Sequence, residues 1–340
     1  MENSHTTHTV IIGGGFAGLY LAHHLLSRGH TDFLLVAPDT TTVSDKSYYN
    51  IRSRGVKQAS LKASISATGG KKCNAQLVNT LLNNIDDEIT YLSHLTPLQP
   101  SYLGAQVVDP KALLSQLRGE LGPRRIHSEV LAIRKQKKGI IVEMLAGIIH
   151  CDTVVLCTGG NRARLSDKFA DERTQYNMFD IASRVGCAIE SPEMVMRHPF
   201  YSKGVCIPSD NLYDYDIVDQ EQKRLSLTHH LIRAHNAHHR FDDICKEYEK
   251  TTERYAVKGK ERIVLDIEPH YILGGIRINR RGETTVKHIY ALGECAYGMH
   301  GEARLGGCSM SEILVMSRVV AEQLIGSSGG APVMGELEME

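Results

Sequence analysis

The chain has 340 residues and 42% hydrophobic content, enough to bury a sizeable core, and its 39 basic residues balance its 39 acidic ones, so no polyanion such as a nucleic acid is implied as a partner. No apolar run approaches the roughly 18 residues of a membrane span, and the polar start MENSHTTHT lacks the charged-then-apolar build of a signal peptide, so a cytoplasmic protein without a membrane span is expected. The 8 cysteines contain no CxxC pair and therefore indicate neither an Fe–S cluster nor a Cys-rich zinc site.

A glycine-rich turn follows the first predicted strand. Residues 9–12 are a short apolar run, GGGFAG comes next, and the helical run LYLAHHLLSRG ends at Gly29. The three glycines at GxGxxG spacing make a tight turn, admit a pyrophosphate and let the helix pack against the strand, while the helix N-terminus faces the phosphates. The segment predicts a dinucleotide-binding unit. The residues expected to bind the cofactor are Gly13, Gly15, Phe16, Ala17 and Gly18.

The second predicted strand, residues 33–36, is normally followed by an acid that binds the adenosine ribose. Here Ala37, Pro38 and Asp39 follow, so the acid is displaced, and either Asp39 or backbone groups bind the ribose. Residues 40–60 show no periodicity and predict a long loop over the cofactor.

The middle of the chain alternates helices and strands. Apolar residues at helical spacing predict an amphipathic helix over residues 75–95, and Asp109 with Pro110 fit the N-cap and first position of a second helix. Residues 126–133, 139–145, 148–149 and 153–157 predict a β-meander that returns to the parallel sheet. A helix over 174–186 and a strand over 187–189 follow, and a helical stretch is predicted over 220–256.

The segment from Tyr290 to Glu312 predicts a strand, a turn, a glycine-broken loop and a helix. Gly293 allows a sharp turn that presents Glu294 at the carboxyl end of a strand, where a carboxylate suits a sugar hydroxyl. Ser309 is expected to cap a helix that runs from Glu312 to Ile325, whose N-terminal dipole would stabilise a reduced flavin. His300 and Arg304 are donors suited to a carboxylate.

Several motifs resemble one flavoprotein family. HGEARLGGCSMSE is similar to the HGANRLxxNSLxE motif of the family that contains succinate dehydrogenase, fumarate reductase and L-aspartate oxidase, and YALGE resembles its LYAxGE segment. PHYILGG at 269–275 resembles the HYxxGG segment, and RHPF at 197–200 resembles the FHPT segment. The resemblance covers about residues 9–325.

The resemblance implies an α/β fold: a Rossmann-like FAD-binding domain with an inserted small capping domain. Residues 9–200 would form the first part of the FAD-binding domain, 201–268 a reduced capping domain, 269–325 the second part of the FAD-binding domain, and 326–340 a disordered tail. The family's C-terminal helical domain is expected to be missing.

The resemblance also implies non-covalent FAD. Aligning Gly69 and Gly70 with the family's GG pair places Ala63 where covalent members carry the flavin-bonded histidine. The CTGG segment is similar to the family's ATGG, which lies against the adenine half of FAD. Besides the N-terminal turn and Asp39, the implied FAD-binding residues are Thr68, Gly69, Gly70, Thr158, Gly159, Gly293, Glu294, Gly307, Ser309 and Met310.

His198, His270 and Arg304 match the family's carboxylate-binding positions. No clear PRDxxxR motif supplies the proton-shuttling arginine, and Arg233 is the candidate for that role. Five histidines between 229 and 239 are possible metal ligands, but no set of four ligands with an acidic partner is evident, so no metal is expected.

The implied activity is hydride transfer between flavin N5 and a carbon adjacent to a carboxylate. The favoured substrate is a small dicarboxylate, with an L-aspartate oxidase-like reaction first and a soluble fumarate reductase-like reaction second. The third alternative is a flavin-binding electron-transfer or regulatory subunit without substrate chemistry of its own. The sequence leaves the electron acceptor and the oligomeric state open.

Overall fold

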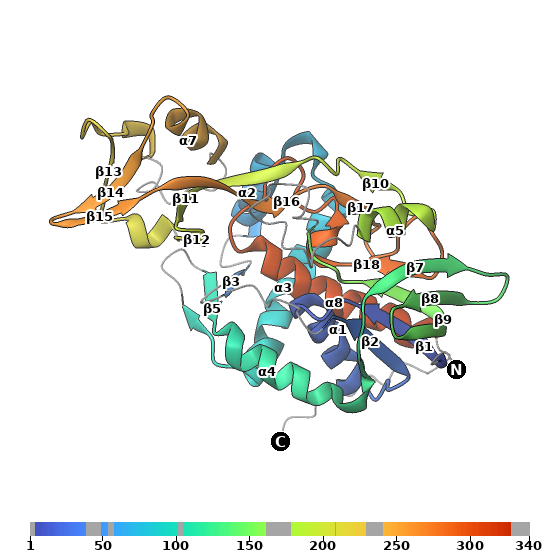
Figure 1. The fold of residues 1–340 in the computed structure, drawn as a ribbon. Coiled ribbons are helices and arrows are strands. Elements are labelled where there is room, and N and C mark those ends of the chain that lie inside the picture. The colour runs from blue at the N-terminus through green and yellow to red at the C-terminus, as the bar shows by residue number, and fades with distance from the viewer. Residues whose placement is uncertain are drawn as a thin grey trace, which may run out of the picture.

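The computed structural model describes residues 4–38, 49–53, 58–100, 105–160, 178–207, 209–228 and 241–327. Figure 1 shows a larger part, in which helices pack on a sheet, and a smaller part that carries α7 and β13 to β15 and is joined to it by the long strands β11 and β16. The predicted α/β class is confirmed. None of the helices in these residues is long and apolar enough to cross a membrane.

The main sheet has seven strands in the order β6-β2-β1-β9-β8-β7, with β18 paired to β9. β1 lies parallel to β2 and β9, and Ile12 is in register with both Val36 and Leu156. β18 is parallel to β9, with Ala291 opposite Leu156. The first, second and last parallel strands therefore end at one edge of the sheet. The strands are β1 (Ser4–Ile12), β2 (Phe33–Ala37), β6 (Arg125–His127), β7 (Val130–Lys135), β8 (Ile140–Met144), β9 (Gly147–Leu156) and β18 (Ile289–Ala291).

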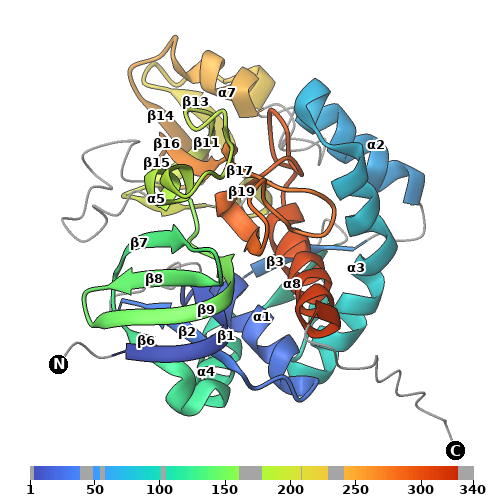
Figure 2. The same ribbon diagram turned by 90° about the vertical axis from the view of Figure 1, so that its right-hand side faces the viewer.

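Helices cover the sheet, and α1, α3 and α8 lie side by side (Figure 2). The predicted helix over 75–95 is confirmed as α3, and Asp109 caps α4 by accepting the Lys111 N–H at 2.8 Å. The helices are α1 (Phe16–Ser27), α2 (Gln58–Gly69), α3 (Ala75–Leu95), α4 (Pro110–Leu121), α5 (Met178–Arg184), α7 (Phe241–Tyr248) and α8 (Cys308–Ser327).

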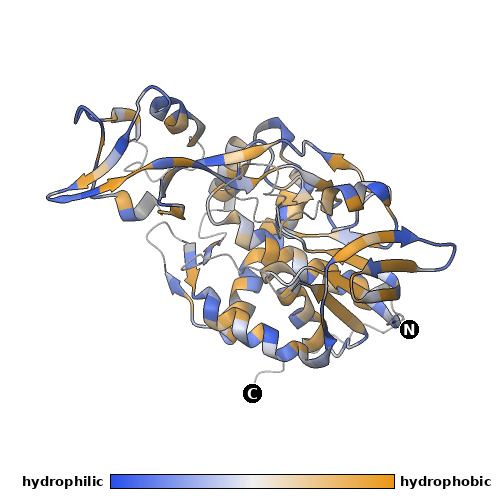
Figure 3. Cartoon of the chain, in the orientation of Figure 1, coloured by the Kyte–Doolittle hydropathy of each residue, from blue (hydrophilic) through white to orange (hydrophobic). Residues whose placement is uncertain are grey.

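A large apolar core lies between these helices and the sheet, and Figure 3 shows apolar residues concentrated there. A second, smaller core forms where β11 and β16 leave the main body, and it includes Met196, Phe200, Phe241 and Tyr271. The division into domains at 200/201 and 268/269 remains a prediction.

The smaller part and its neighbours are mostly short antiparallel strands. Two three-stranded sheets, β12-β11-β16 and β13-β14-β15, build it. The remaining strands are β3 (Tyr49–Arg52), β4 (Gln99–Pro100), β5 (Ala105–Val108), β10 (Ile189–Glu190), β11 (Val195–Ser202), β12 (Val205–Cys206), β13 (Asp216–Asp219), β14 (Arg254–Lys258), β15 (Glu261–Val264), β16 (Asp266–Ile272), β17 (Gly275–Arg277) and β19 (Ala296–Tyr297).

The helix predicted over 220–256 is wrong at both ends. A turn follows β13 at Asp219, and the chain is extended again in β14, where Tyr255 pairs with Val218 on one side and Val264 on the other. β-branched and aromatic residues fit such a pairing, and long-range pairing overrode the local helical pattern. Between these strands, α7 is helical.

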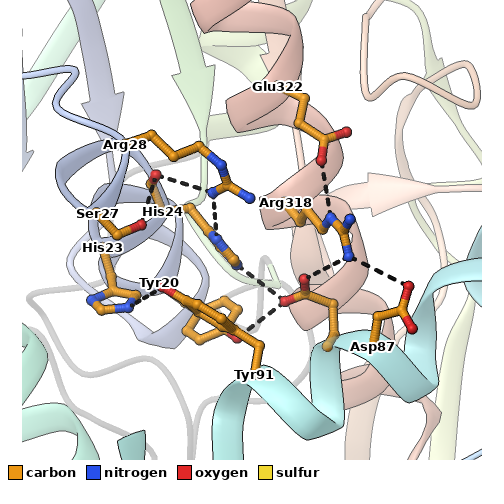
Figure 4. A network of polar contacts seen from close by, with 10 residues as sticks. Tyr20, His23, His24, Ser27, Arg28, Asp87, Tyr91, Arg318 and Glu322 are labelled. Atoms are coloured by element: carbon orange, nitrogen blue, oxygen red, sulfur yellow. Dashed lines mark hydrogen bonds and ion pairs between the residues drawn. The ribbon is translucent and has the colours of Figure 1, made fainter. Parts of the chain in front are cut away.

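A buried polar network ties α1, α3 and α8 together (Figure 4). Glu88, only 1% exposed, accepts hydrogen bonds from the Tyr20 hydroxyl and His24 Nε2, both at 3.1 Å, and lies 3.4 Å from Arg318 Nη1. Arg28 Nη1 donates to His24 Nδ1 at 2.8 Å. His24 is therefore held as the neutral ring with its proton on Nε2.

This arrangement predicts a loss of stability in acid. Burial lowers the pKa of His24 below its ordinary value, so the unfolded chain takes up a proton more readily than the folded one. As pH falls below about 6.5, the free energy of unfolding should fall by up to about 1.4 kcal/mol per pH unit for this group. Urea unfolding at several pH values should show a shallower fall in His24→Gln than in the wild type, whereas exposed His94→Gln should behave like the wild type. Equal slopes in all three proteins would contradict the prediction.

Candidate active site

Three turns meet at the carboxyl edge of the main sheet. A Cβ added to Gly13, where φ is +121°, would lie 2.2 Å from the Cys157 carbonyl oxygen, so the first turn packs directly on the end of β9. Gly293 has φ +78°, and a Cβ added to it would lie only 3.2 Å from the Cβ of Ala17. Close backbone approach of this kind requires glycine at these positions. The GxGxxG, CTGG and LGE turns therefore form one continuous surface.

This surface fits the phosphates of a dinucleotide. Gly15 is the N-cap of α1 and makes no side-chain cap hydrogen bond, which leaves the first N–H groups of α1 available to a ligand. A Cβ on Gly15 or on Gly159 would meet no atom of the described residues within 4 Å, so these residues leave space beside both turns. Phe16 and Ala17 begin α1 at this place.

Glu294 stands beside the CTGG turn, at the carboxyl end of β18. Its Oε1 accepts the Ile272 N–H at 3.0 Å and would lie 2.4 Å from a Cβ on Gly160. The side chain is half-buried. The role of Glu294 toward a sugar hydroxyl stays a prediction, and Thr158 and Gly159 lie on the turn beside it.

The end of α2 packs against the loop before α8. A Cβ on Gly69 would lie 2.5 Å from the His300 carbonyl oxygen, and the Glu302 N–H donates to the Gly69 carbonyl at 2.8 Å. The Thr68 hydroxyl donates to the Ser64 carbonyl within α2, and Gly70 takes φ +60°. The structure therefore brings the TGG and HGEARL segments together.

The prediction that Ser309 caps α8 is wrong by two residues, because the N-cap position is Gly307. Gly307, at φ +82°, makes the turn, and α8 begins at Cys308, so Ser309 lies inside the first turn of the helix. Met310 lies in the same turn and is half-buried.

Two cysteines near this loop are protonated. Burial raises the pKa of the Cys308 thiol to about 11, and that of Cys295 to about 11 as well, so neither is a thiolate at neutral pH.

His198 on β11 and His270 on β16 form a buried pair. Their ring centroids are 4.7 Å apart, and the two residues are 5% and 9% exposed. The Phe200 N–H donates to His198 Nδ1 at 3.2 Å, and the Tyr201 hydroxyl lies 2.9 Å from His270 Nδ1. Two residues that were predicted from separate motifs are thus brought together.

Arg304 is a buried cation, 5% exposed. Its guanidinium lies 4.5 Å from the centre of the Tyr271 ring, and its Nη1 donates to the Leu305 carbonyl at 3.4 Å. Its buried Nε has no hydrogen-bond partner among the residues that the structure describes. Within the described residues no carboxylate lies at ion-pair distance from it. A buried charge without a counter-ion is costly, so this group is suited to an anionic ligand.

His300 is engaged inside the protein. Its Nε2 lies 2.8 Å from Glu312 Oε2, an ion-pair distance, although neither atom meets hydrogen-bond geometry. The His300 ring also contacts Tyr271 edge-on at 5.5 Å. The expectation that His300 donates to a ligand is not supported by this contact, since a buried carboxylate faces it.

Two predicted residues, Asp39 and Arg233, lie outside the described residues, as does the histidine cluster at 229–239. Tyr201 and Tyr271, which contact the site residues, were missed by sequence reasoning. The position of Tyr271 directly after His270 in PHYILGG was the one available signal. For Tyr201 the strand pairing was needed.

The chain is similar to known flavoproteins. Residues 160–310 match the FAD binding domain family. The chain is 42% identical over 65 residues to the fumarate reductase flavoprotein subunit of Escherichia coli (strain K12), covering 19% of this chain and 11% of that protein. It is 24% identical over 262 residues to L-aspartate oxidase 2 of Ralstonia nicotianae, covering 65% of this chain and 49% of that protein.

These matches span less than two thirds of the relatives' own length. An E. coli quinol fumarate reductase structure superimposes with a TM-score of 0.78 at 17% identity, covering 97% of this chain and 72% of that one, which shows a shared fold. The motifs, the glycine-lined turns and these comparisons together assign FAD as the cofactor. The chain therefore contains an FAD binding domain and is similar in sequence to fumarate reductase flavoprotein subunits and L-aspartate oxidases.

Proposed function

We propose that this chain transfers a hydride between FAD and a small dicarboxylic acid, and that the reaction is the oxidation of L-aspartate or a close analogue. The observation that carries the proposal is the buried Arg304 guanidinium, which has no carboxylate partner among the described residues. A substrate carboxylate would provide the missing counter-ion through a planar pair of charge-assisted hydrogen bonds.

The second carboxylate is assigned to the His198 and His270 pair. Tyr271, whose ring lies 4.5 Å from the Arg304 guanidinium, follows His270 directly in β16, so this strand carries both the residue that packs on Arg304 and one member of the histidine pair. All three side chains are at least nine-tenths buried, which strengthens hydrogen bonds to a ligand by excluding water. A ligand with two carboxylates matches both ends.

Bound FAD supplies the hydride acceptor or donor for such a substrate. The residues of this chain bind and orient the substrate: Arg304 holds one carboxylate, and the imidazoles hold the other. Orientation of this kind contributes to the rate by fixing the reacting carbon. The group that moves the substrate proton stays a prediction, with Arg233 as the candidate.

Fumarate reduction is the second candidate, because the similar proteins carry both names. The same carboxylate-binding groups serve either reaction, so these residues do not decide the direction. A flavin-binding subunit without substrate chemistry is less favoured, since it would have no use for a buried Arg304 that lacks a carboxylate partner among the described residues.

The carboxylate assignment can be tested by binding alone. Malonate has two carboxylates but neither an α-amino group nor a CH₂–CH₂ unit that could be oxidised, and it should cause a saturable change in the bound flavin's visible spectrum. Propionate, with a single carboxylate, should bind far more weakly. His270→Ala should raise the dissociation constant of malonate by roughly tenfold, the effect of losing one hydrogen bond to a charged group. An unchanged spectrum at saturating millimolar malonate would contradict the proposal.

The absence of a histidine at position 63 predicts dissociable FAD. Ala63 lies exposed on α2 and offers no nucleophile for a covalent bond to the flavin. Acid precipitation of the purified yellow protein should leave the flavin in the supernatant, as measured by its absorbance. Flavin that stays with the washed pellet would show that another residue forms a covalent link.

A further inference from the structure

The protonation of His198 follows from one backbone hydrogen bond. The Phe200 amide donates to His198 Nδ1 at 3.2 Å, and a backbone N–H can only donate. Nδ1 therefore carries no proton. His198 is a neutral ring whose proton is on Nε2, which makes Nε2 a hydrogen-bond donor, and Cys206 Sγ, a weak acceptor, lies 3.8 Å from it.

The equivalent nitrogen of His270 faces a hydroxyl in place of an amide. Tyr201 OH lies 2.9 Å from His270 Nδ1, and the two residues are 7% and 9% exposed. A hydroxyl can donate or accept, so this contact decides which nitrogen of a neutral His270 ring carries the proton. The centroid of the His270 ring also lies 4.7 Å from that of the neutral His198 ring, and the two planes are tilted by 43°.

The strand pairing explains how Tyr201 reaches His270. In β11 and β16, His198 is in register with Glu268 and Tyr201 with Asp266, with irregularities on both sides of His198. β-bulges of this kind bend a strand and re-aim its side chains. The hydroxyl of Tyr201 thereby meets a histidine four positions away from its register partner.

We propose that Tyr201 is a positioning residue that donates its hydroxyl proton to His270 Nδ1 and thereby holds the His270 proton on Nε2. Both imidazoles of the pair then offer an Nε2–H donor to the same anionic group. This inference rests on the proposed function, because a carboxylate ligand needs donors. It adds a residue that the family motifs do not contain and that sets how the substrate is held.

Turnover gives the first test. Tyr201→Phe keeps the ring and removes the hydroxyl, so some His270 rings should change tautomer and present an acceptor to the carboxylate. KM for the reactive dicarboxylate should rise about tenfold, with kcat changed less than twofold and FAD content unchanged. Tyr215→Phe is the matched control, because it also removes a phenol hydrogen bond, the exposed one to Glu261 at 2.7 Å. It should leave KM unchanged.

A double substitution separates positioning from general structure. In a His270→Gln background the hydroxyl has no imidazole to orient, so adding Tyr201→Phe should change KM less than twofold. A further tenfold rise in that background would overturn the proposal, because Tyr201 would then act on something other than His270.

Imidazole ¹⁵N spectra of histidine-labelled holoprotein test the tautomer without any substrate. The His270 signals, assigned by their loss in His270→Gln, should show a proton on Nε2 in the wild type and a mixture in Tyr201→Phe. A proton on Nδ1 in the wild type, or spectra that Tyr201→Phe leaves unchanged, would overturn the inference. If no dicarboxylate binds or reacts, the proposed function fails, whereas these spectra still decide the role of Tyr201.

Discussion

Arg304→Lys is expected to lower kcat/KM for a reactive dicarboxylate by at least about tenfold while the protein keeps its FAD. Lysine retains the charge but loses the planar pair of donors that matches a carboxylate. Losing charge-assisted hydrogen bonds costs on the order of 1.5–3 kcal/mol, which corresponds to a factor of about 10 to 150. Steady-state kinetics and flavin absorbance measure the two quantities on the same preparation.

The melting temperature distinguishes this role from a structural one. Arg304 makes no ion pair within the described chain, so its replacement should shift the melting temperature of the holoprotein little. Arg277→Lys is the matched control, since Arg277 is an exposed arginine paired with Glu190 at 3.1 Å. Arg277→Lys should change neither the melting temperature nor kcat/KM appreciably. A large drop in melting temperature with unchanged kcat/KM for Arg304→Lys would mean that the arginine serves the fold.

Gly15→Val is expected to abolish FAD binding and leave the fold intact. The residue has φ of −77°, which any amino acid adopts, and a Cβ there meets no protein atom within 4 Å. The added side chain would occupy the space beside the N-terminus of α1 that the pyrophosphate needs. The variant should purify colourless, with an unfolding transition like that of the FAD-free wild type, the proper reference because bound FAD itself stabilises.

Gly18→Val should fail for a different reason. A Cβ on Gly18 would lie 2.0 Å from the Gly13 carbonyl oxygen, so the helix and the turn would have to separate. Overpacking against a backbone atom costs about 1–3 kcal/mol or more, and the FAD-free protein itself should be destabilised or insoluble. Gly119→Val, in α4 with nothing within 4 Å of its Cβ, is the control for the substitution type. Normal FAD occupancy in Gly15→Val would refute the assignment of this turn.

The local motifs predicted much of the larger part. The GxGxxG turn, helix α3 with its apolar stripe and the Asp109 cap of α4 all depend on residues close in sequence, where spacing and capping chemistry act directly. The convergence of the three turns at one sheet edge also follows, because parallel strands align their carboxyl ends.

The smaller part could not be predicted in the same way. Strands β13 and β14 pair across more than thirty residues of chain, and the local pattern of residues 220–256 resembled a helix. The start of α8 was missed because Gly307 turns the chain before Ser309 can act as a cap. Tyr201 escaped notice because its contact with His270 depends on irregular pairing between β11 and β16.

The most direct test of the account is an anaerobic flavin spectrum of the purified protein with a panel of dicarboxylates. We expect L-aspartate, or a closely related amino- or hydroxy-dicarboxylate, to bleach the oxidised flavin band in the wild type, with the rate sharply reduced in Arg304→Lys. Failure of every dicarboxylate to bleach the oxidised flavin, together with failure of fumarate to reoxidise the reduced flavin, would contradict the proposed chemistry.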